Sequence, residues 1–236
     1  MESTVAIVLA AGSGVRVGRT VNKIHLSVGD APVIARSARA FRDHPEVDEL
    51  YVVAAPAELE LCRETLEVAG IVADDVIAGG ATRHASELAA LERLAARIEC
   101  GEIGTVLIHD AARPLVDDDT ISVTIAAARQ HGGAVAALPV ERPLAVVHDG
   151  VVVGRREPTR LWRAQTPQAF AARPLLDSYR RALAEGFEGS DTAMSLERTS
   201  THVQVVQGHE RNLKITYPLD LVRAEVVLEN SKDACA

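Results

Sequence analysis

The sequence has few aromatic residues and no excess of positive charge. Only 3% of its 236 residues are Phe, Trp or Tyr, whereas 47% are hydrophobic, so a core must be built from Ala, Val, Leu and Ile. Aliphatic cores of this kind are typical of parallel sheets covered by helices. The formal net charge of −8 does not favour a general nucleic-acid binder, because such proteins have basic surfaces. An acidic protein still binds anions where a few Arg and Lys side chains converge in one cleft.

The sequence also lacks cysteine pairs and long apolar runs. Cys62, Cys100 and Cys235 are widely spaced and form no CxxC pattern, which is typical of free thiols in a reducing compartment. No apolar stretch approaches the length of a membrane span. The short apolar run at residues 5–9 ends in a glycine-rich turn and does not resemble a signal peptide. We therefore expect a cytoplasmic protein with neither a membrane nor a nucleic acid as its partner.

Strand and helix patterns alternate along the chain. This rhythm predicts an α/β fold with a doubly wound, mostly parallel sheet. The expected strands are residues 5–9, 50–54, 75–78, 106–108, 134–140 and 203–206. The expected helices are residues 32–41, 58–68, 86–98, 118–130, 174–184, 191–197 and 219–228.

The rhythm breaks between residues 141 and 162. Two β-rich runs there flank Asp149-Gly150, and an Asp-Gly dipeptide in this setting is a strong hairpin signal. We predict one domain over residues 1–236, with an antiparallel arm inserted at about 141–162. A two-stranded hairpin is marginally stable by itself, so the arm is expected to pack on a second subunit.

A glycine-rich turn and two basic residues follow the first expected strand. The run is Leu9-Ala10-Ala11-Gly12-Ser13-Gly14-Val15-Arg16, and Lys23 comes seven residues later. Successive N–H groups of small residues can cradle phosphate oxygens, and the two cations would add positive charge beside them. Neither a Walker loop nor a complete dinucleotide fingerprint is present. An ordinary turn with two surface cations explains this segment equally well.

A second glycine motif, Gly79-Gly80-Ala81-Thr82-Arg83-His84-Ala85-Ser86, precedes an expected helix. Its glycines permit close approach of the backbone to a ligand, and the Ser86 hydroxyl could read the edge of a base. The alternative is that Ser86 caps the helix.

A third motif, Ile108-His109-Asp110-Ala111-Ala112-Arg113-Pro114, ends a buried strand. Ligands of open α/β sheets bind beyond the carboxyl ends of the strands, so Asp110 could hold a metal ion or a ribose and Arg113 a phosphate. The alternative is an Asp–Arg pair that stabilises the loop. We interpret His109 as a packed, hydrogen-bonded side chain and not as a base.

Two further motifs are Gln165-Thr166-Pro167-Gln168 and Asn212-Leu213-Lys214-Ile215-Thr216. We expect the second to form an otherwise apolar strand. Lys214 then needs an anion or a carboxylate as its partner, because an unpaired buried ammonium group is costly.

Taken in this order, the five motifs resemble those of the 2-C-methyl-D-erythritol 4-phosphate cytidylyltransferase family, over roughly residues 4 to 229. The resemblance implies a Rossmann-like domain, a homodimer with exchanged β-arms and a requirement for Mg²⁺. It also implies transfer of CMP from CTP to methylerythritol phosphate, with release of pyrophosphate, in non-mevalonate isoprenoid synthesis. A phosphate monoester is already anionic near neutral pH, so this reaction needs cations to align two anions and no general base.

The resemblance also assigns roles to individual residues. Arg113 is expected to reach into the site of the neighbouring subunit, and no metal ligands are assigned. The catalytic cations are Arg16, Lys23 and Lys214; the nucleotide-binding residues are Ala10, Ala11, Gly12, Gly14, Gly80, Ser86 and Asp110; the acceptor-binding residues are Arg113, Ser190 and Arg160.

The acceptor half departs from the family pattern. Arg142-Pro143 stands where the family's arm carries Asp-Thr, and Pro158 stands where an arginine is expected, so Arg142, Arg156 or Arg160 would have to supply the charge. These departures leave open another acceptor, such as ribitol 5-phosphate, or a catalytically weak nucleotide-binding relative. A dinucleotide-dependent oxidoreductase is disfavoured by the missing fingerprint.

Overall fold

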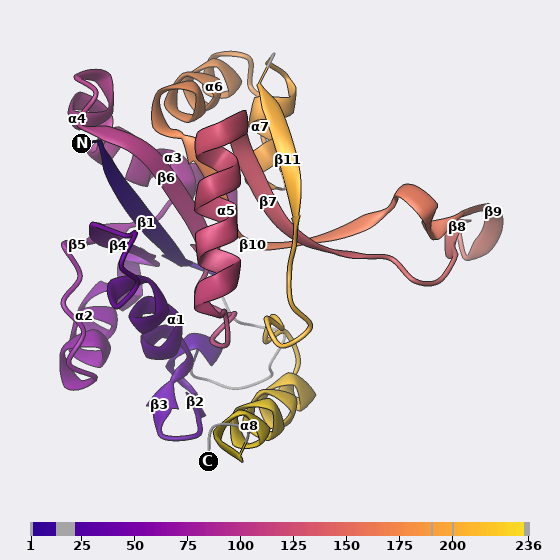
Figure 1. The fold of residues 1–236 in the computed structure, drawn as a ribbon, viewed down its shortest axis with the longest axis horizontal. Coiled ribbons are helices and arrows are strands. Elements are labelled where there is room, and N and C mark those ends of the chain that lie inside the picture. Colours follow the sequence, from indigo (N-terminus) through magenta and orange to yellow (C-terminus); the bar gives the residue numbers. More distant parts are fainter. Residues whose placement is uncertain (1, 13–21, 190, 200, 234–236) are drawn as a thin grey trace.

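A seven-stranded sheet forms the centre of the molecule in a computed structural model, which describes residues 2–12, 22–189, 191–199 and 201–233 (Figure 1). The strand order is β11-β7-β10-β6-β1-β4-β5. All these strands run in one direction except β10, which is antiparallel to both of its neighbours. The predicted mostly parallel α/β sheet is thus confirmed. The strands are β1 (Ser3–Ala10), β4 (Glu49–Ala54), β5 (Asp75–Ala78), β6 (Ile103–Asp110), β7 (Gly132–Pro139), β10 (Trp162–Ala171) and β11 (His202–Gln207).

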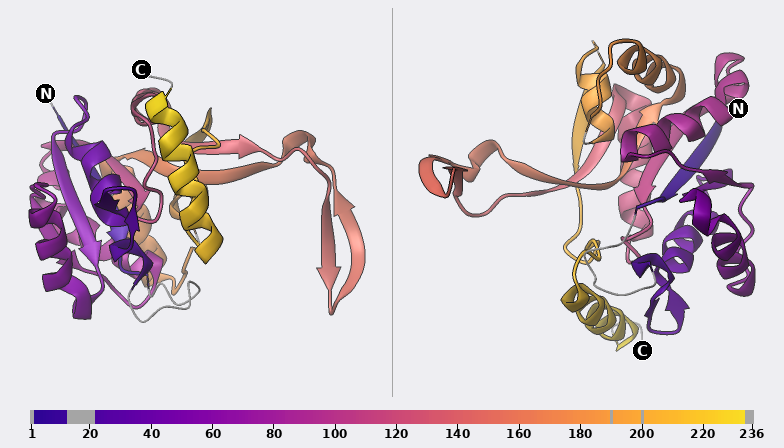
Figure 2. Two further views of the ribbon diagram at one scale, coloured as in Figure 1. Left: turned by 90° about the horizontal axis from the view of Figure 1, so that it is seen from below. Right: turned by 180° about the vertical axis from the view of Figure 1, so that it is seen from behind.

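Helices cover both faces of this sheet (Figures 1 and 2). Successive side chains of a strand point to opposite faces, so Ala6 and Val8 of β1 enter one buried cluster, while Val5 and Ile7 enter the other. Both faces of the strand are therefore apolar, as a doubly wound sheet requires. The first cluster includes α1 (Val33–Arg42), α2 (Leu59–Val68) and α5 (Asp118–His131); the second includes α3 (Arg83–Arg93), α4 (Ala95–Glu99), α6 (Ala172–Ala184) and α7 (Thr192–Glu197).

The start of α3 corrects one prediction. Thr82 is the N-cap residue, and its hydroxyl accepts a hydrogen bond from the Ala85 N–H at 3.1 Å. The helix therefore begins at Arg83, and Ser86 lies inside it. Thr82 takes the cap because its extended backbone aims its hydroxyl at the free N–H groups of the first turn. The predicted helix over 86–98 is also divided at Leu94 into α3 and α4.

Two other segments differ from prediction. Strand β10 was not predicted, because its Gln-Thr-Pro-Gln motif includes a proline that cannot donate to a strand ladder. The pairing of β10 with β7 is in fact interrupted between Ala164 and Gln168. The predicted strand around Lys214 is wrong, since residues 213–216 have no strand structure. This segment is instead fixed by a hydrogen bond from the Ile215 N–H to the Ala112 carbonyl at 2.8 Å.

The predicted arm is confirmed as an antiparallel hairpin of β8 (Leu144–His148) and β9 (Val151–Arg156). Asp149 and Gly150 both have positive φ, at 48° and 79°, as a two-residue type I′ turn requires. The hairpin extends away from the sheet (Figures 1 and 2). Apolar side chains are exposed along it, among them Val146, Val147, Val151, Val152 and Val153.

Short elements complete the fold near the ends of the sheet. The pair β2 (Ser27–Val28) and β3 (Ala31–Pro32), which was not predicted, precedes α1. The C-terminal helix α8 (Pro218–Asp233) contributes Ala224 to a third buried cluster with Val28, Val33 and Ile215.

In the described part of the chain, no helix combines the length and the apolar character needed to cross a membrane. The 3-10 turns are η2 (Lys23–His25), η3 (Pro56–Glu58) and η4 (Pro158–Arg160).

Candidate active site

A cleft of about 470 Å³ opens at the carboxyl ends of β1, β5 and β6. This is the edge of an open α/β sheet where ligands bind. The sequence motifs reach it because parallel strands end on the same side. The predicted residues that line the cleft are Ala10, Ala11, Gly12, Lys23, Gly80, Ser86, Asp110 and Lys214.

The remaining predicted residues lie elsewhere. Gly14, Arg16 and Ser190 fall outside the described residues. Arg113 is buried beneath the cleft, and Arg160 is exposed in η4 at the base of the arm. Neither of these two arginines lines the cleft of its own chain.

Lys23 links the segment after β1 with the segment before α8 at the cleft. Asn22 caps η2, and its side-chain amide donates to the Gly12 carbonyl at 2.8 Å, which links the first glycine turn to Lys23. The Lys23 ammonium group donates to the Ile215 carbonyl at 2.6 Å. Lys23 is 9% exposed, so its charge lies in a partly dry environment where electrostatic interactions are stronger than in water.

The second glycine motif packs against protein atoms, which changes our interpretation of its role. A Cβ on Gly79 would lie 2.6 Å from the Ala11 side chain, and one on Gly80 would lie 2.5 Å from the Ala85 side chain. The glycines therefore allow the turn after β5 to approach β1 and α3. The Ser86 hydroxyl donates to the Thr82 carbonyl at 2.8 Å and accepts from the Gly80 N–H at 3.1 Å. Ser86 thus holds the wall of the cleft in place.

Asp110 is the centre of a charged cluster on the cleft floor. Its carboxylate lies 2.7 Å from the Lys214 ammonium, 3.5 Å from Arg83 and 3.8 Å from Arg113. Burial alone would raise the pKa of Asp110, but Lys214 and Arg83 hold it well below its usual range. Asp110 is therefore ionised, and Lys214 has the carboxylate partner that the sequence predicted.

The Gln-Thr-Pro-Gln motif fixes the backbone of Asp110. The Asp110 N–H donates to the Thr166 hydroxyl at 3.0 Å, and the same hydroxyl lies 3.1 Å from Nδ1 of His109. Nε2 of His109 lies 3.1 Å from the Arg113 carbonyl. Burial lowers the pKa of His109 to about 4, so the imidazole is neutral near pH 7. The prediction of a packed, hydrogen-bonded His109 is confirmed.

Arg113 is hydrogen-bonded to the same group of loops. Its guanidinium donates to the Asn212 carbonyl at 2.7 Å, while the Asn212 amide donates to the Thr166 carbonyl at 2.7 Å. These bonds connect the loop after β6, the irregular part of β10 at Thr166 and the loop before α8. The Arg113 side chain is buried in its own chain, and this placement supports the alternative in which it stabilises the loop.

Arg83 lines the cleft, yet sequence reasoning gave it no role. Its guanidinium contacts Glu87 at 2.5 Å as well as Asp110 at 3.5 Å. The available signal was its place in the second glycine motif, one residue after the helix cap. The described part of the cleft wall therefore carries three cations, Lys23, Arg83 and Lys214, and one carboxylate, Asp110.

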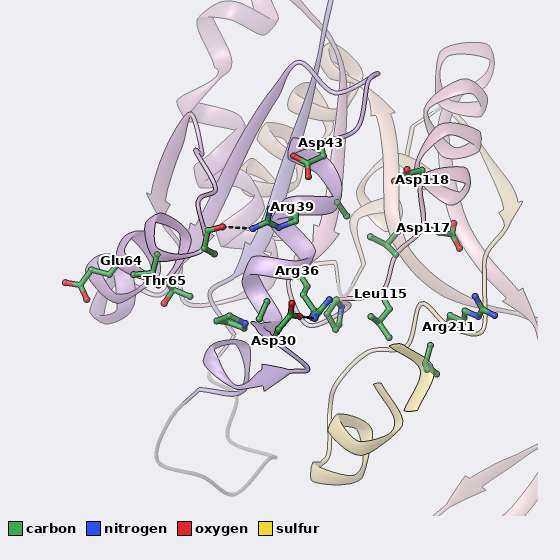
Figure 3. A pocket seen from close by; sticks show the side chains of 18 of the residues that line it. Asp30, Arg36, Arg39, Asp43, Glu64, Thr65, Leu115, Asp117, Asp118 and Arg211 are labelled. Atoms are coloured by element: carbon green, nitrogen blue, oxygen red, sulfur yellow. Dashed lines mark hydrogen bonds and ion pairs between the residues drawn. The ribbon is translucent and has the colours of Figure 1, made fainter. Parts of the chain in front are cut away.

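A larger groove of about 1290 Å³ lies between α1, α2, residues 114–118 and α8 (Figure 3). Arg36 is paired there with Asp30, and Arg39 donates to the Ala69 carbonyl. Asp117 caps α5 by accepting from the Thr120 N–H. These charged groups have structural partners, whereas residues of the sequence motifs line the smaller cleft, which we take as the candidate active site.

The described residues do not form a preassembled metal site. No group of three or more His, Cys, Asp or Glu side chains is placed to hold a metal ion among them. Asp110 is the single carboxylate on the described cleft wall. Because Mg²⁺ often uses one or two carboxylates together with substrate phosphates and water, this donor set fits an ion that is bound mainly by a triphosphate.

Comparison with known proteins agrees with this geometry. A family model described as 2-C-methyl-D-erythritol 4-phosphate cytidylyltransferase matches residues 4–230. Proteins of that name from Geobacter metallireducens and Syntrophotalea carbinolica are each 38% identical, over 95% and 98% of this chain and 97% and 98% of theirs.

Solved structures give the same result. The 4-diphosphocytidyl-2C-methyl-D-erythritol synthase of Anaerococcus prevotii superimposes with a TM-score of 0.82 at 25% identity, over 97% of this chain and 96% of that one. The 2-C-methyl-D-erythritol 4-phosphate cytidylyltransferase of Thermus thermophilus gives 0.75 at 30% identity, over 94% and 98%. The chain belongs to the 2-C-methyl-D-erythritol 4-phosphate cytidylyltransferase family.

Proposed function

We propose that this protein transfers CMP from CTP to 2-C-methyl-D-erythritol 4-phosphate and releases pyrophosphate, as a step of isoprenoid synthesis. The observation that carries this proposal is the convergence of Lys23, Arg83 and Lys214 on one cleft at the strand ends. Such a site suits a reaction between two anions, because its cations offset a repulsion of several kcal/mol at short range.

In the proposed reaction, a phosphate oxygen of the acceptor attacks the α-phosphorus of CTP. The new P–O bond forms as the bond between the α-phosphorus and the bridging oxygen to the β-phosphate breaks, and pyrophosphate leaves with the negative charge. Lys23 neutralises charge on the triphosphate, and Arg16, which lies outside the described residues, is assigned the same role from its sequence motif. Lys214, oriented by Asp110, lies between the acceptor phosphate and the nucleotide. Cations placed where charge develops act mainly by electrostatic stabilisation.

The small residues form the proposed cytidine side of the cleft. Ala10, Ala11, Gly12 and Gly80 line this side of the cleft, and Ser86 keeps that wall rigid. Gly14 is assigned to the same side from its sequence motif alone. Ser86 has no role as a nucleophile here, since its hydroxyl proton is donated to the Thr82 carbonyl.

We propose Mg²⁺ as the divalent ion that accompanies CTP. Asp110 is the residue that would contact it, directly or through water, alongside the triphosphate. When bound, the ion supplies charge neutralisation for the phosphates and the leaving group. The fit rests on the single carboxylate of the described cleft wall.

The proposed active form is a homodimer through the arm, in which residues 1–236 form one domain. Its support is the row of exposed apolar side chains on the hairpin, because large exposed apolar patches mark interaction surfaces. In this arrangement, Arg160 of one protomer would reach the acceptor side of its partner's cleft, with Arg142 and Arg156 nearby. Ser190, and Arg113 through the Asn212 loop, would complete the acceptor side.

A cytoplasmic location fits the unpaired Cys62 and Cys100 thiols.

A pyrophosphate-release assay tests the proposed function. With CTP and Mg²⁺, we expect turnover on methylerythritol phosphate and much slower release on ribitol 5-phosphate. The names of the relatives do not favour the ribitol alternative or an inactive paralogue. Equal or faster turnover on ribitol 5-phosphate, or tight CTP binding without any pyrophosphate release, would reverse the assignment.

A further inference from the structure

A buried carboxylate lies directly behind the cleft and takes no part in the chemistry described above. Glu87 lies on the second turn of α3 and is 1% exposed. One of its oxygens accepts from the Thr192 hydroxyl at 2.7 Å and contacts Arg83 at 2.5 Å; the other accepts from the Tyr179 hydroxyl. Burying a carboxylate is costly unless it is paired and hydrogen-bonded, and here both oxygens have partners.

The partners of Glu87 are themselves rigidly held. Tyr179 and Thr192 are fully buried, and the Tyr179 ring stacks on His84 with ring centroids 4.3 Å apart. The Thr192 hydroxyl also accepts from Arg83 at 3.0 Å while donating to Glu87. A group with both hydrogen-bond directions fixed by its neighbours has a defined orientation. The Glu87 carboxylate is therefore a fixed point supported by α6 and α7.

Arg83 connects this fixed point with the cleft. One terminal nitrogen of its guanidinium faces Glu87 and Thr192, and the other lies 3.5 Å from Asp110. An arginine side chain loses about 2 kcal/mol of rotamer freedom when it is held in one position. Arg83 approaches Oδ1 of Asp110, whereas Lys214 contacts Oδ2. Without Glu87, the Arg83 guanidinium would be free to move toward Oδ2 and compete there with Lys214.

We propose that Glu87, together with Thr192, is a positioning residue for CMP transfer: it holds the Arg83 guanidinium at the cleft wall, where Arg83 approaches Oδ1 of Asp110 and leaves Oδ2 to Lys214. This inference rests on the proposed function. It assigns Glu87 an indirect role, because Glu87 does not line the cleft. The substrate-facing groups that depend on it are Arg83 and, through Asp110, Lys214.

A positioning role and a purely electrostatic role of Glu87 predict different changes in kcat and in the Kd for CTP when Glu87 is replaced by Gln. Removing a negative charge behind the cleft makes the cleft more positive, so electrostatics alone would tighten CTP binding and leave turnover unchanged. Loss of positioning leaves Arg83 free to shift, and misplacement of about 1 Å can lower a rate by as much as 10²-fold. We expect kcat of Glu87→Gln to fall about tenfold, while the Kd for CTP changes less than threefold.

Glu92→Gln is the matched control. Glu92 lies on the same helix and is paired with Arg180 at 2.7 Å, but it is exposed and does not line the cleft. This variant removes the same charge outside the network, so we expect kcat within about twofold of the unchanged protein, as for a surface substitution.

Thr192 supplies a second test that does not depend on a buried charge. Thr192→Val removes the hydroxyl between Arg83 and Glu87, whereas Thr192→Ser retains it. We expect a fall in kcat of about fivefold for Val and near-complete recovery for Ser, because Val loses both charge-assisted hydrogen bonds of the Thr192 hydroxyl, from Arg83 and to Glu87. Thermal melting establishes that each variant is folded.

The outcomes separate this inference from the proposed function. No turnover by the unchanged protein on methylerythritol phosphate contradicts the proposed function. An active unchanged protein with equal kcat in Glu87→Gln overturns the positioning role. If Glu87→Gln does not fold, the Thr192 pair decides, and equal kcat for Val and Ser overturns the inference.

Discussion

The Lys214 ammonium group lies 2.7 Å from the Asp110 carboxylate, across 104 residues of sequence. Removing Lys214 takes away a cation that the proposed mechanism requires, and it leaves Asp110 with two more distant cations, Arg83 and Arg113. We expect Lys214→Ala to lower kcat by about 10²–10³-fold. It should also lower the free energy of unfolding by about 1–3 kcal/mol, because a mostly buried carboxylate loses its closest partner.

A double-mutant cycle checks the Lys214–Asp110 contact. Asp110→Asn removes the negative charge that pairs with Lys214. The losses of stability in Lys214→Ala and Asp110→Asn should therefore not add. We expect a coupling free energy of about 1 kcal/mol from urea unfolding of the two single variants and the double variant. Strict additivity would mean that this ion pair does not hold the cleft floor together.

Lys23 is the second cation whose loss should lower kcat more than it lowers stability. We expect Lys23→Ala to lower kcat by about 10²–10³-fold, because its charge stabilises the triphosphate as pyrophosphate leaves. Arg39→Ala is the control, since Arg39 lies in the larger groove and donates to the Ala69 carbonyl. Steady-state kinetics on folded protein gives the comparison, and near-normal turnover of Lys23→Ala would remove η2 from the active site.

The arm should determine the oligomeric state. Val147 and Val152 lie opposite each other in the hairpin, and each is 55% exposed. Replacing both with Asp should give monomers, because an interface would have to bury two unpaired charges. Val68→Asp, at a 90% exposed position on α2, is the control. Light scattering after size exclusion measures the state, and an intact protein that is a fully active monomer would rule out the arm as an interface.

Replacing Arg160 should weaken binding of the acceptor and leave binding of CTP unchanged. Arg160 is exposed in its own chain, so Arg160→Ala should not change stability. We expect the KM for methylerythritol phosphate to rise at least tenfold, as for loss of a hydrogen bond to a charged phosphate of about 1.5–3 kcal/mol. The Kd for CTP should stay unchanged.

Pro143→Thr provides the reciprocal test of the acceptor side. Proline has no N–H and no hydroxyl, so a threonine there adds a donor and should lower this KM. Efficient turnover that survives Ala at Arg142, Arg156 and Arg160 in turn would show that the arm does not contact the acceptor.

His109 makes stability depend on pH. Burial lowers its pKa to about 4, below the value of about 6.5 in an unfolded chain. The unfolded state therefore binds the extra proton first, and stability is lost as the pH falls from about 6.5 to 4, by up to about 3 kcal/mol. Burial lowers the pKa of His25 and His84 too, which adds loss of the same sign.

Urea unfolding at about pH 7.5 and about pH 4.5 measures this loss. In His109→Asn, the free energy of unfolding should be lower at both pH values and should fall less between them. An unchanged difference between the two pH values would mean that His109 does not remain neutral in the folded protein.

Local patterns were sufficient to predict most strands, the hairpin and the cleft-facing motifs. The parallel strands of the sheet end on one side, so residues at their carboxyl ends, such as Ala10 and Asp110, had to lie close together. The contacts between motifs were not predictable in this way. The Arg83–Glu87–Thr192 network depends on how α7 packs against α3, and β10 depends on neighbours that override its proline. These are results of tertiary packing, which leaves no periodic signal in a single sequence.

The hydrogen bond from Lys23 to the Ile215 carbonyl spans 192 residues, and this has a consequence for biosynthesis. A chain emerging from the ribosome can build its first βαβ units early, yet its cleft lacks a wall until the segment with Lys214 has been made. Contacts of such long sequence separation also form late in folding, since loop closure must come first. We therefore expect a nascent or truncated chain that stops before Lys214 to be inactive, however much of its sheet has formed.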